Sequence, residues 1–187
     1  EDYLAKIDKI KLPNTKIKLL QQLLARAIGE IKKVNKVKGV DFSKKMEGLV
    51  SRYNERKGDV LLGEVYEEMA EQLTDLIWQV QKEFSAGEKL GIDFEEKAFY
   101  DILRELCVKY DFQYPEHKLI ELSKAIKDLV DEQAKFPDWS KRNDIKSALK
   151  VGLILLLDEH GYPPVERDEV YEEIFEQAEN FKKNRAV

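Results

Sequence analysis

Residues 138–164 read DWSKRNDIKSALKVGLILLLDEHGYPP, and their composition decides what kind of core the chain can build. In the middle, residues 151–157 form a run of seven without a polar side chain. Further apolar residues precede the run, so a helix here would be apolar on every side; they are Ile145, Ala148 and Leu149. Because a helix without a polar face is normally buried among other elements, we predict that residues 140–160 form the buried centre of the core.

Polar residues and turn formers bound this predicted helix. Asp138 and Ser140 are candidate N-caps, and Gly161-Tyr162-Pro163-Pro164 is a stop signal. The apolar run is much shorter than the ~18 residues that a membrane span requires. We therefore expect a core helix and no membrane segment.

Composition favours an all-α protein. Of the 187 residues, 43% are hydrophobic and 37% charged, whereas only 9 are Gly and 5 are Pro, which is few turn formers for this length. A single cysteine, Cys107, permits no internal disulfide and suits a reducing compartment. With no signal peptide recognised, we expect a cytoplasmic protein. Because the chain starts at Glu1 without an initiator Met, we also expect a piece of a larger one.

Helical periodicity recurs along the chain, and no segment alternates like a strand. One heptad pattern, at Ile17, Leu20, Leu24, Ala27, Ile31 and Val34, predicts a helix that Gly39 ends. Asp93 followed by Glu96 predicts a capping box at the start of another helix. We predict an all-α bundle of about seven to eight helices around the buried helix 140–160. Residues 1–13 would be a lead-in to upstream domains, and residues 14–187 the helical domain itself.

A search for catalytic chemistry gives no self-sufficient site. The chain lacks a nucleotide-phosphate loop, and neither His117 nor His160 has a second ligand at metal spacing on its own helix face. His160 is expected to cap the C-terminal end of its helix. Cys107 lies on an apolar face and is expected to be a small core residue.

Asp93, Glu95 and Lys97 resemble the end of a metal-nuclease pattern. That chemistry requires carboxylates on adjacent strands around a shared divalent metal, whereas here the three residues begin a helix. We therefore predict no catalytic, cofactor-binding or metal-binding residue in this chain.

Charge is distributed unevenly. Residues 1–60 hold 15 Lys/Arg and 8 Asp/Glu, a balance of +7, whereas residues 61–187 hold 17 and 29, a balance of −12. The basic side chains could contact DNA phosphates without reading sequence, or the basic helices could simply pack against the acidic ones. The candidate phosphate contacts are Lys32, Lys33, Lys36, Lys38, Lys44, Lys45, Arg52, Arg56 and Lys57.

Three segments, in this order, resemble the C-terminal helical region of type I restriction enzyme R subunits. They are residues 12–57 (LPNTKIKLLQQLLARAIGEIKKVNKVKGVDFSKKMEGLVSRYNERK), residues 91–103 (GIDFEEKAFYDIL), and the stretch ending in GYPP followed by residues 176–181 (EQAENF). The resemblance covers nearly the whole chain. It rests on the combination and order of the segments, because none of them is a catalytic signature.

The resemblance implies a function. In that family an N-terminal nuclease domain and two motor lobes use ATP and Mg²⁺ to pull DNA, and the helical region helps to dock them onto the modification (methyltransferase) and specificity subunits. By this resemblance the chain is an assembly module of a restriction-modification system, with contact to duplex DNA as an added role. It would have no activity or cofactor of its own. The alternatives are a domain that only braces the motor lobes of its own chain and, less favoured, an independent enzyme.

Overall fold

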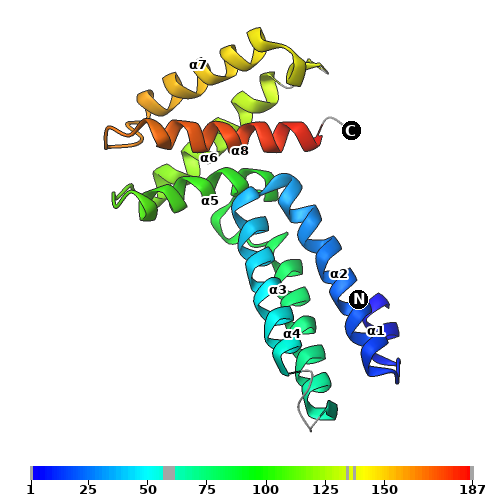
Figure 1. Cartoon of the computed structure of the whole chain (residues 1–187). Coiled ribbons are helices and arrows are strands. Elements are labelled where there is room, and N and C mark those ends of the chain that lie inside the picture. Colours follow the sequence, from blue (N-terminus) through cyan, green and yellow to red (C-terminus); the bar gives the residue numbers. More distant parts are fainter. Residues whose placement is uncertain (1, 57–61, 134, 137, 186–187) are drawn as a thin grey trace. The chain divides into compact units, whose positions relative to one another are not determined.

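The computed structural model of the chain describes residues 2–56, 62–133, 135–136 and 138–185, and every regular element among them is a helix (Figure 1). The predicted all-α class is confirmed. The α-helices are α1 (Asp2–Asp8), α2 (Pro13–Val34), α3 (Lys36–Arg56), α4 (Leu62–Glu83), α5 (Phe94–Lys109), α6 (Glu116–Gln133), α7 (Asn143–Glu159) and α8 (Asp168–Arg185). Two short 3-10 helices, η1 (Glu88–Leu90) and η2 (Trp139–Lys141), precede α5 and α7.

The chain divides into two compact units. The N-terminal unit consists of Glu1–Lys32 and Gly39–Phe84, and the C-terminal unit of Lys33–Lys38 and Ser85–Val187. The corner between α2 and α3 thus belongs with the helices that follow much later in the sequence. A separate lead-in over residues 1–13 stays a prediction.

In the N-terminal unit, α2 buries one stripe of large aliphatic side chains. Four of the six residues in the predicted heptad pattern are buried there, but Ile28 takes the place that the pattern gave to Ala27. Ala27 and Val34 are only half-buried. Helices α3 and α4 meet through Tyr53 and Tyr66, whose ring centroids are 6.0 Å apart.

The predicted stop at Gly39 is wrong, because Gly39 lies inside α3. The break between α2 and α3 comes four residues earlier, at Asn35, whose side-chain oxygen accepts a hydrogen bond from Lys38 N at 3.0 Å and so caps the new helix. Gly39 has a different role here. A Cβ at this position would lie 2.6 Å from Lys32 Cβ, so only glycine allows the first turn of α3 to approach the end of α2 this closely.

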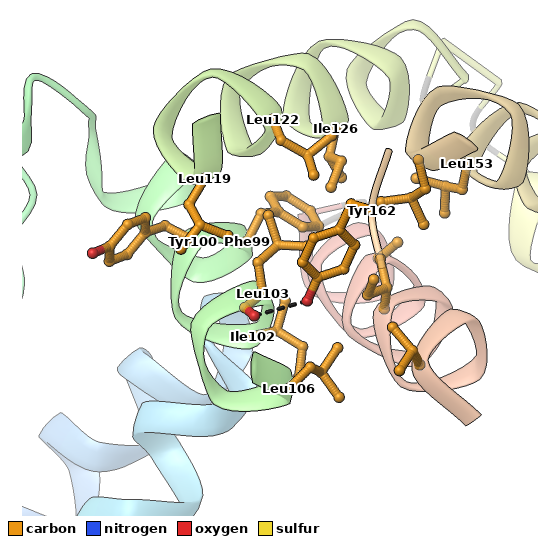
Figure 2. Close-up of a cluster of buried hydrophobic side chains, with 14 of the residues drawn as sticks. Phe99, Tyr100, Ile102, Leu103, Leu106, Leu119, Leu122, Ile126, Leu153 and Tyr162 are labelled. Atoms are coloured by element: carbon orange, nitrogen blue, oxygen red, sulfur yellow. Dashed lines mark hydrogen bonds between the residues drawn. The ribbon is translucent and has the colours of Figure 1, made fainter. Parts of the chain in front are cut away.

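In the C-terminal unit, α5 is the central helix and packs against both α6 and α8 (Figure 2). All seven residues from 97 to 103 are buried, although they include a lysine, a tyrosine and an aspartate. Leu103 and Leu106 are fully buried in the same cluster as Leu122 of α6, and the Phe99 ring meets the ring of Phe181 of α8 edge to face at 5.4 Å. The core of this unit is therefore organised around α5.

Helix α7 is not the buried centre that its composition predicts. Only one face of it is buried, through Ile145, Leu149, Leu153 and Leu157. On the opposite face Val151 is 56% and Leu155 63% exposed. The physical reason is its position: α7 packs mainly against α6, η2 and α8, and these contacts leave Val151 and Leu155 exposed.

The predicted end of this helix is confirmed. Gly161 adopts a positive φ of 64°, and its N–H donates to Asp158 O at 2.9 Å while Tyr162 N donates to Leu157 O at 2.9 Å. This is a Schellman motif, which satisfies the last carbonyl groups of a helix and favours glycine at the left-handed position. The turn directs Tyr162 into the core, where its hydroxyl donates to Leu103 O of α5 at 2.8 Å (Figure 2).

Candidate functional site

The predicted phosphate-contacting residues are divided between the two units. Lys32, Lys44, Lys45, Arg52 and Arg56 belong to the N-terminal unit, and all five are exposed. Two of them lie beside carboxylates: Lys45 Nζ is 3.6 Å from an Asp41 oxygen, and Arg56 Nη1 donates to Glu68 at 2.6 Å. Part of the positive charge of α3 is therefore balanced locally.

The remaining predicted residues are near or beyond the α2–α3 corner. Lys33 and Lys36 are exposed and Lys38 is half-buried, and all three belong to the C-terminal unit. Lys36 Nζ forms an ion pair with Glu176 of α8 at 2.9 Å. Lys57 lies outside the described residues. Contact of these residues with DNA stays a prediction.

A buried polar network fixes the α2–α3 corner to α5. Asn35 is fully buried, and its Nδ2 donates to Asp101 Oδ2 at 2.8 Å. Lys97 Nζ, one helical turn before Asp101, donates to the same oxygen at 2.8 Å. The buried ammonium and carboxylate thus neutralise each other, and the amide of Asn35 both joins this pair and caps α3.

Helix α8 also forms hydrogen bonds with the corner between α2 and α3. Gln177 is buried, and its amide nitrogen donates to Val34 O at 2.9 Å while its carbonyl oxygen accepts from Lys36 N at 3.1 Å. These are two backbone groups that the break in the helix leaves unpaired. The arrangement is structural, because its polar groups are already satisfied by one another.

The three residues that resemble a nuclease pattern have separate structural roles. Asp93 and Glu96 form the predicted capping box of α5: Glu96 N donates to Asp93 Oδ1 at 2.7 Å, and Asp93 N to Glu96 Oε2 at 2.9 Å. Glu95 lies 3.4 Å from Lys127 of α6, and Lys97 belongs to the buried network. The structure does not bring these side chains together around one point.

The two histidines and the cysteine are also placed by packing. His160 is the C-cap residue of α7, and its Nδ1 lies 2.9 Å from Leu156 O, as expected for a helix cap. His117 is exposed on α6. Cys107 is half-buried against the C-terminal core, and burial raises the pKa of its thiol, so the thiolate needed for nucleophilic chemistry is disfavoured.

One buried cation was not predicted from sequence. Lys182 of α8 is 2% exposed, and its Nζ lies 4.5 Å from the centroid of the Trp139 ring. Among the described residues no hydrogen-bond acceptor reaches this ammonium. Burial lowers the pKa of Lys182 to about 8. The Lys-Lys-Asn-Arg ending of α8 gave no signal of this, since consecutive lysines normally lie in solvent.

Two kinds of site are absent from the described part of the chain. No group of three or more His, Cys, Asp or Glu residues in it could hold a metal ion. None of its helices is long and apolar enough to cross a membrane.

Comparison with known proteins gives a family and two relatives. Residues 1–184 match the family described as "Type I restriction enzyme HindI endonuclease subunit-like, C-terminal". The protein named MjaIXP endonuclease subunit of a type I restriction enzyme, from Methanocaldococcus jannaschii, is 24% identical over 187 residues, which cover 96% of this chain and 17% of that protein. The HindI endonuclease subunit of Haemophilus influenzae is 22% identical over 179 residues, covering 96% of this chain and 16% of the relative. No solved structure matches the chain.

Proposed function

Because the chain belongs to the family of C-terminal domains of type I restriction endonuclease subunits, we propose that it is an assembly domain. It docks the DNA translocase and endonuclease part of its subunit onto the methyltransferase core. Its partners are the modification (methyltransferase) and specificity subunits. One observation carries this proposal: the family match extends over residues 1–184, while the chain spans only about one sixth of each relative.

The chemistry of the whole enzyme belongs to other parts of the subunit in this proposal. The parent chain is an ATP-dependent, site-specific deoxyribonuclease subunit, and its upstream motor lobes bind ATP and Mg²⁺. The helical domain contributes position and no reacting group. The buried pair of Lys97 and Asp101 agrees with this role, because the two side chains satisfy each other.

Exposed apolar side chains on α7 support a protein partner. Val151 and Leu155 lie on the same exposed face of this helix. An apolar patch in contact with water commonly marks a surface that another protein covers. An exclusively internal bracing domain is the alternative function.

Deletion of the helical domain tests the proposal. We expect a full-length subunit that lacks this region to remain able to hydrolyse ATP but to be lost from the complex with the modification and specificity subunits, as measured by co-purification. Retention of the truncated subunit in a cleavage-competent complex would contradict docking. Loss of ATP hydrolysis by the isolated truncated subunit, with binding to the core retained, would favour internal bracing.

Contact with duplex DNA is a second candidate function, which the exposed lysines of α2 and α3 favour. Each phosphate contact that a cation makes contributes roughly −0.9 to the slope of log affinity against log salt. The charge-reversal test uses the exposed residues Lys32, Lys33 and Lys44. Lys36 is left out, because Lys36→Glu would place two carboxylates side by side at Glu176.

The test compares two sets of variants in the assembled enzyme. Replacing Lys32, Lys33 and Lys44 by Glu should weaken duplex binding regardless of sequence and make its salt dependence shallower. The matched control replaces Lys118 and Lys124, exposed lysines of α6, by Glu. Unchanged affinity and salt slope in the first set would remove DNA contact from the proposal and leave docking alone.

A further inference from the structure

Two buried hydrogen-bond donors lie together where the Trp139 ring of η2 meets Lys182 of α8. Trp139 is 3% exposed and Lys182 is 2% exposed. Among the described residues, Nε1 of Trp139 and Nζ of Lys182 are the buried side-chain nitrogen and oxygen atoms that no hydrogen-bond partner reaches. The ammonium lies 4.5 Å from the centroid of the indole ring, so both unpaired donors belong to one contact.

The aromatic ring satisfies only part of the ammonium. A cation above an indole face is attracted by the ring, but a lysine ammonium has three N–H donors and the ring occupies one side of it. The indole N–H lies in the plane of its ring and is a donor as well, so the cation above the ring does not pair with it. Buried polar groups without a hydrogen bond are unfavourable, and a buried charge without a counter-charge is more so. An acceptor at this contact would therefore stabilise the folded chain.

The charge around this contact favours an anion as the acceptor. Lys146 of α7 places a second ammonium 6.0 Å from the centroid of the Trp139 ring. Its partner is Glu179 at 3.6 Å, and both of these side chains are 34% exposed, so the pair lies near the surface. Burial lowers the pKa of Lys182 to about 8, and no carboxylate of the described chain opposes this shift. Because that pKa lies above pH 7, Lys182 is mainly a buried cation at neutral pH.

We propose that this contact is a binding site for a small monovalent anion such as chloride, which accepts hydrogen bonds from Lys182 Nζ and Trp139 Nε1. An anion suits the site better than water, because both unpaired groups are donors and an anion brings no hydrogens that need acceptors of their own. It would supply for Lys182 the counter-charge that Asp101 supplies for Lys97. The bound anion would thereby fix η2 to α8. This proposal is independent of docking and of contact with DNA.

The test measures unfolding of the chain by urea at about pH 7, in sodium chloride and in sodium gluconate of equal ionic strength. Both salts screen surface charges, but gluconate is too large to enter a buried contact. A ligand that binds only the folded chain raises the folding equilibrium constant once its concentration exceeds the dissociation constant. Between about 10 and about 200 mM chloride we expect a rise of about sixfold, as for a site half-filled at about 30 mM. In gluconate the change should be much smaller.

Three variants assign this effect to the site. Lys182→Met removes the ammonium and keeps a long apolar side chain, so the specific response to chloride should disappear. The matched control is Lys183→Met, which removes the same charge from the next residue, an exposed one, and should keep the full response. Trp139→Phe keeps an aromatic ring beside Lys182 but removes the indole N–H. For that variant we expect the dissociation constant for chloride to rise about tenfold, through loss of one charge-assisted hydrogen bond.

Equal stabilisation of Lys182→Met and Lys183→Met by chloride would overturn the proposal, and so would equal effects of chloride and gluconate on the parent chain. Both results would mean charge screening only. A second measurement needs no change at the site: Trp78→Phe leaves Trp139 as the single tryptophan. Iodide bound beside Trp139 should quench its fluorescence to a plateau, whereas the neutral quencher acrylamide should have little effect on a buried ring. Iodide quenching that rises without a plateau would show collisions in solution and no site.

Discussion

Two stretches of seven residues in the C-terminal unit have opposite compositions and opposite surroundings. Residues 97–103, KAFYDIL, include a lysine and an aspartate, and all seven are buried. Residues 151–157, VGLILLL, contain no polar side chain, yet only Leu153 and Leu157 are buried. Composition alone would make residues 151–157 the more buried stretch, whereas the more buried stretch is residues 97–103.

The difference shows what burial requires. A lysine and a carboxylate can both be buried when each is the partner of the other and further hydrogen bonds satisfy what remains, as Asn35 does for Asp101. Apolar side chains have no corresponding requirement to be buried. They can remain exposed at a modest cost per residue, because exposed apolar atoms are common on protein surfaces.

Removal of the buried carboxylate should have the largest effect. Asp101→Ala leaves Lys97 buried without its counter-charge, and we expect the free energy of unfolding to fall by about 3–5 kcal/mol. Urea denaturation measures this. The control is Asp158→Ala on the exposed side of α7, for which a change within about 0.5 kcal/mol is expected. Equal effects of the two substitutions would show that the network around Asp101 is not what stabilises α5.

The one-sided burial of α7 can be tested with two leucines that lie two positions apart in the sequence. Leu153→Ala should destabilise the chain by about 2–4 kcal/mol through lost apolar contacts and a cavity, whereas Leu155→Ala should cost less than about 0.5 kcal/mol. Thermal and urea unfolding of both variants give the comparison. Similar losses would mean that α7 is buried on all sides, as its composition predicts.

A second buried cation shows how a buried lysine behaves when it lies against an aromatic ring and not beside a carboxylate. Lys97 has a carboxylate partner, whereas Lys182 lies against the Trp139 ring, and burial lowers its pKa from 10.5 to about 8. Between these two pH values the unfolded chain binds more protons than the folded one, so stability should rise with pH from about 8 to about 10.

Lys182→Met should abolish that rise in stability with pH. It should also increase the free energy of unfolding at pH 7 by about 1–2 kcal/mol, because the charged form no longer has to be buried. Unfolding by urea at several pH values measures both effects. A pH profile that is the same in the parent chain and in the variant would contradict the assignment to Lys182.

The smallest effect is expected at the N-terminus of α5, the helix that contains residues 97–103. Asp93→Ala removes the side-chain acceptor for Glu96 N, and we expect a loss of about 1 kcal/mol in the free energy of unfolding. Asp93→Asn keeps an acceptor at the same position and serves as the control. Chemical denaturation of both variants should show the loss for alanine only.

Local sequence signals were sufficient for several features that depend on neighbours along the chain. The capping box at Asp93, the stop at Gly161 and the helix cap at His160 were all predicted, and all involve residues within four or five positions of one another. The predicted N-caps of α7, Asp138 and Ser140, are wrong, because α7 begins at Asn143 with Arg142 as its N-cap and no side-chain cap hydrogen bond. Gly39 misled the prediction because glycine serves two purposes. It ends helices, and it also lets two backbones approach, which is its role beside Lys32.

The network around Asn35 could not be predicted in this way. Lys97 and Asp101 are one turn apart and were detectable as a helical ion pair, but Asn35 is 66 residues from Asp101 in sequence. Nothing in the local pattern shows that an asparagine ending one helix is buried against another. The ion pairs of two predicted phosphate contacts, Arg56 and Lys36, could not be predicted for the same reason. Their partners, Glu68 and Glu176, lie on other helices.

The sequence by itself determined the all-α class, some of the helix ends and the family, because periodicity, capping and ordered similarity are properties of short segments and their succession. Only the tertiary structure decided which helix is central. An apolar side chain favours burial wherever a partner surface is available, but the packing of α6 and α8 encloses α5 and leaves one face of α7 open. Burial depends on the number of neighbours that a helix has in space, and the sequence of a single segment does not specify that number.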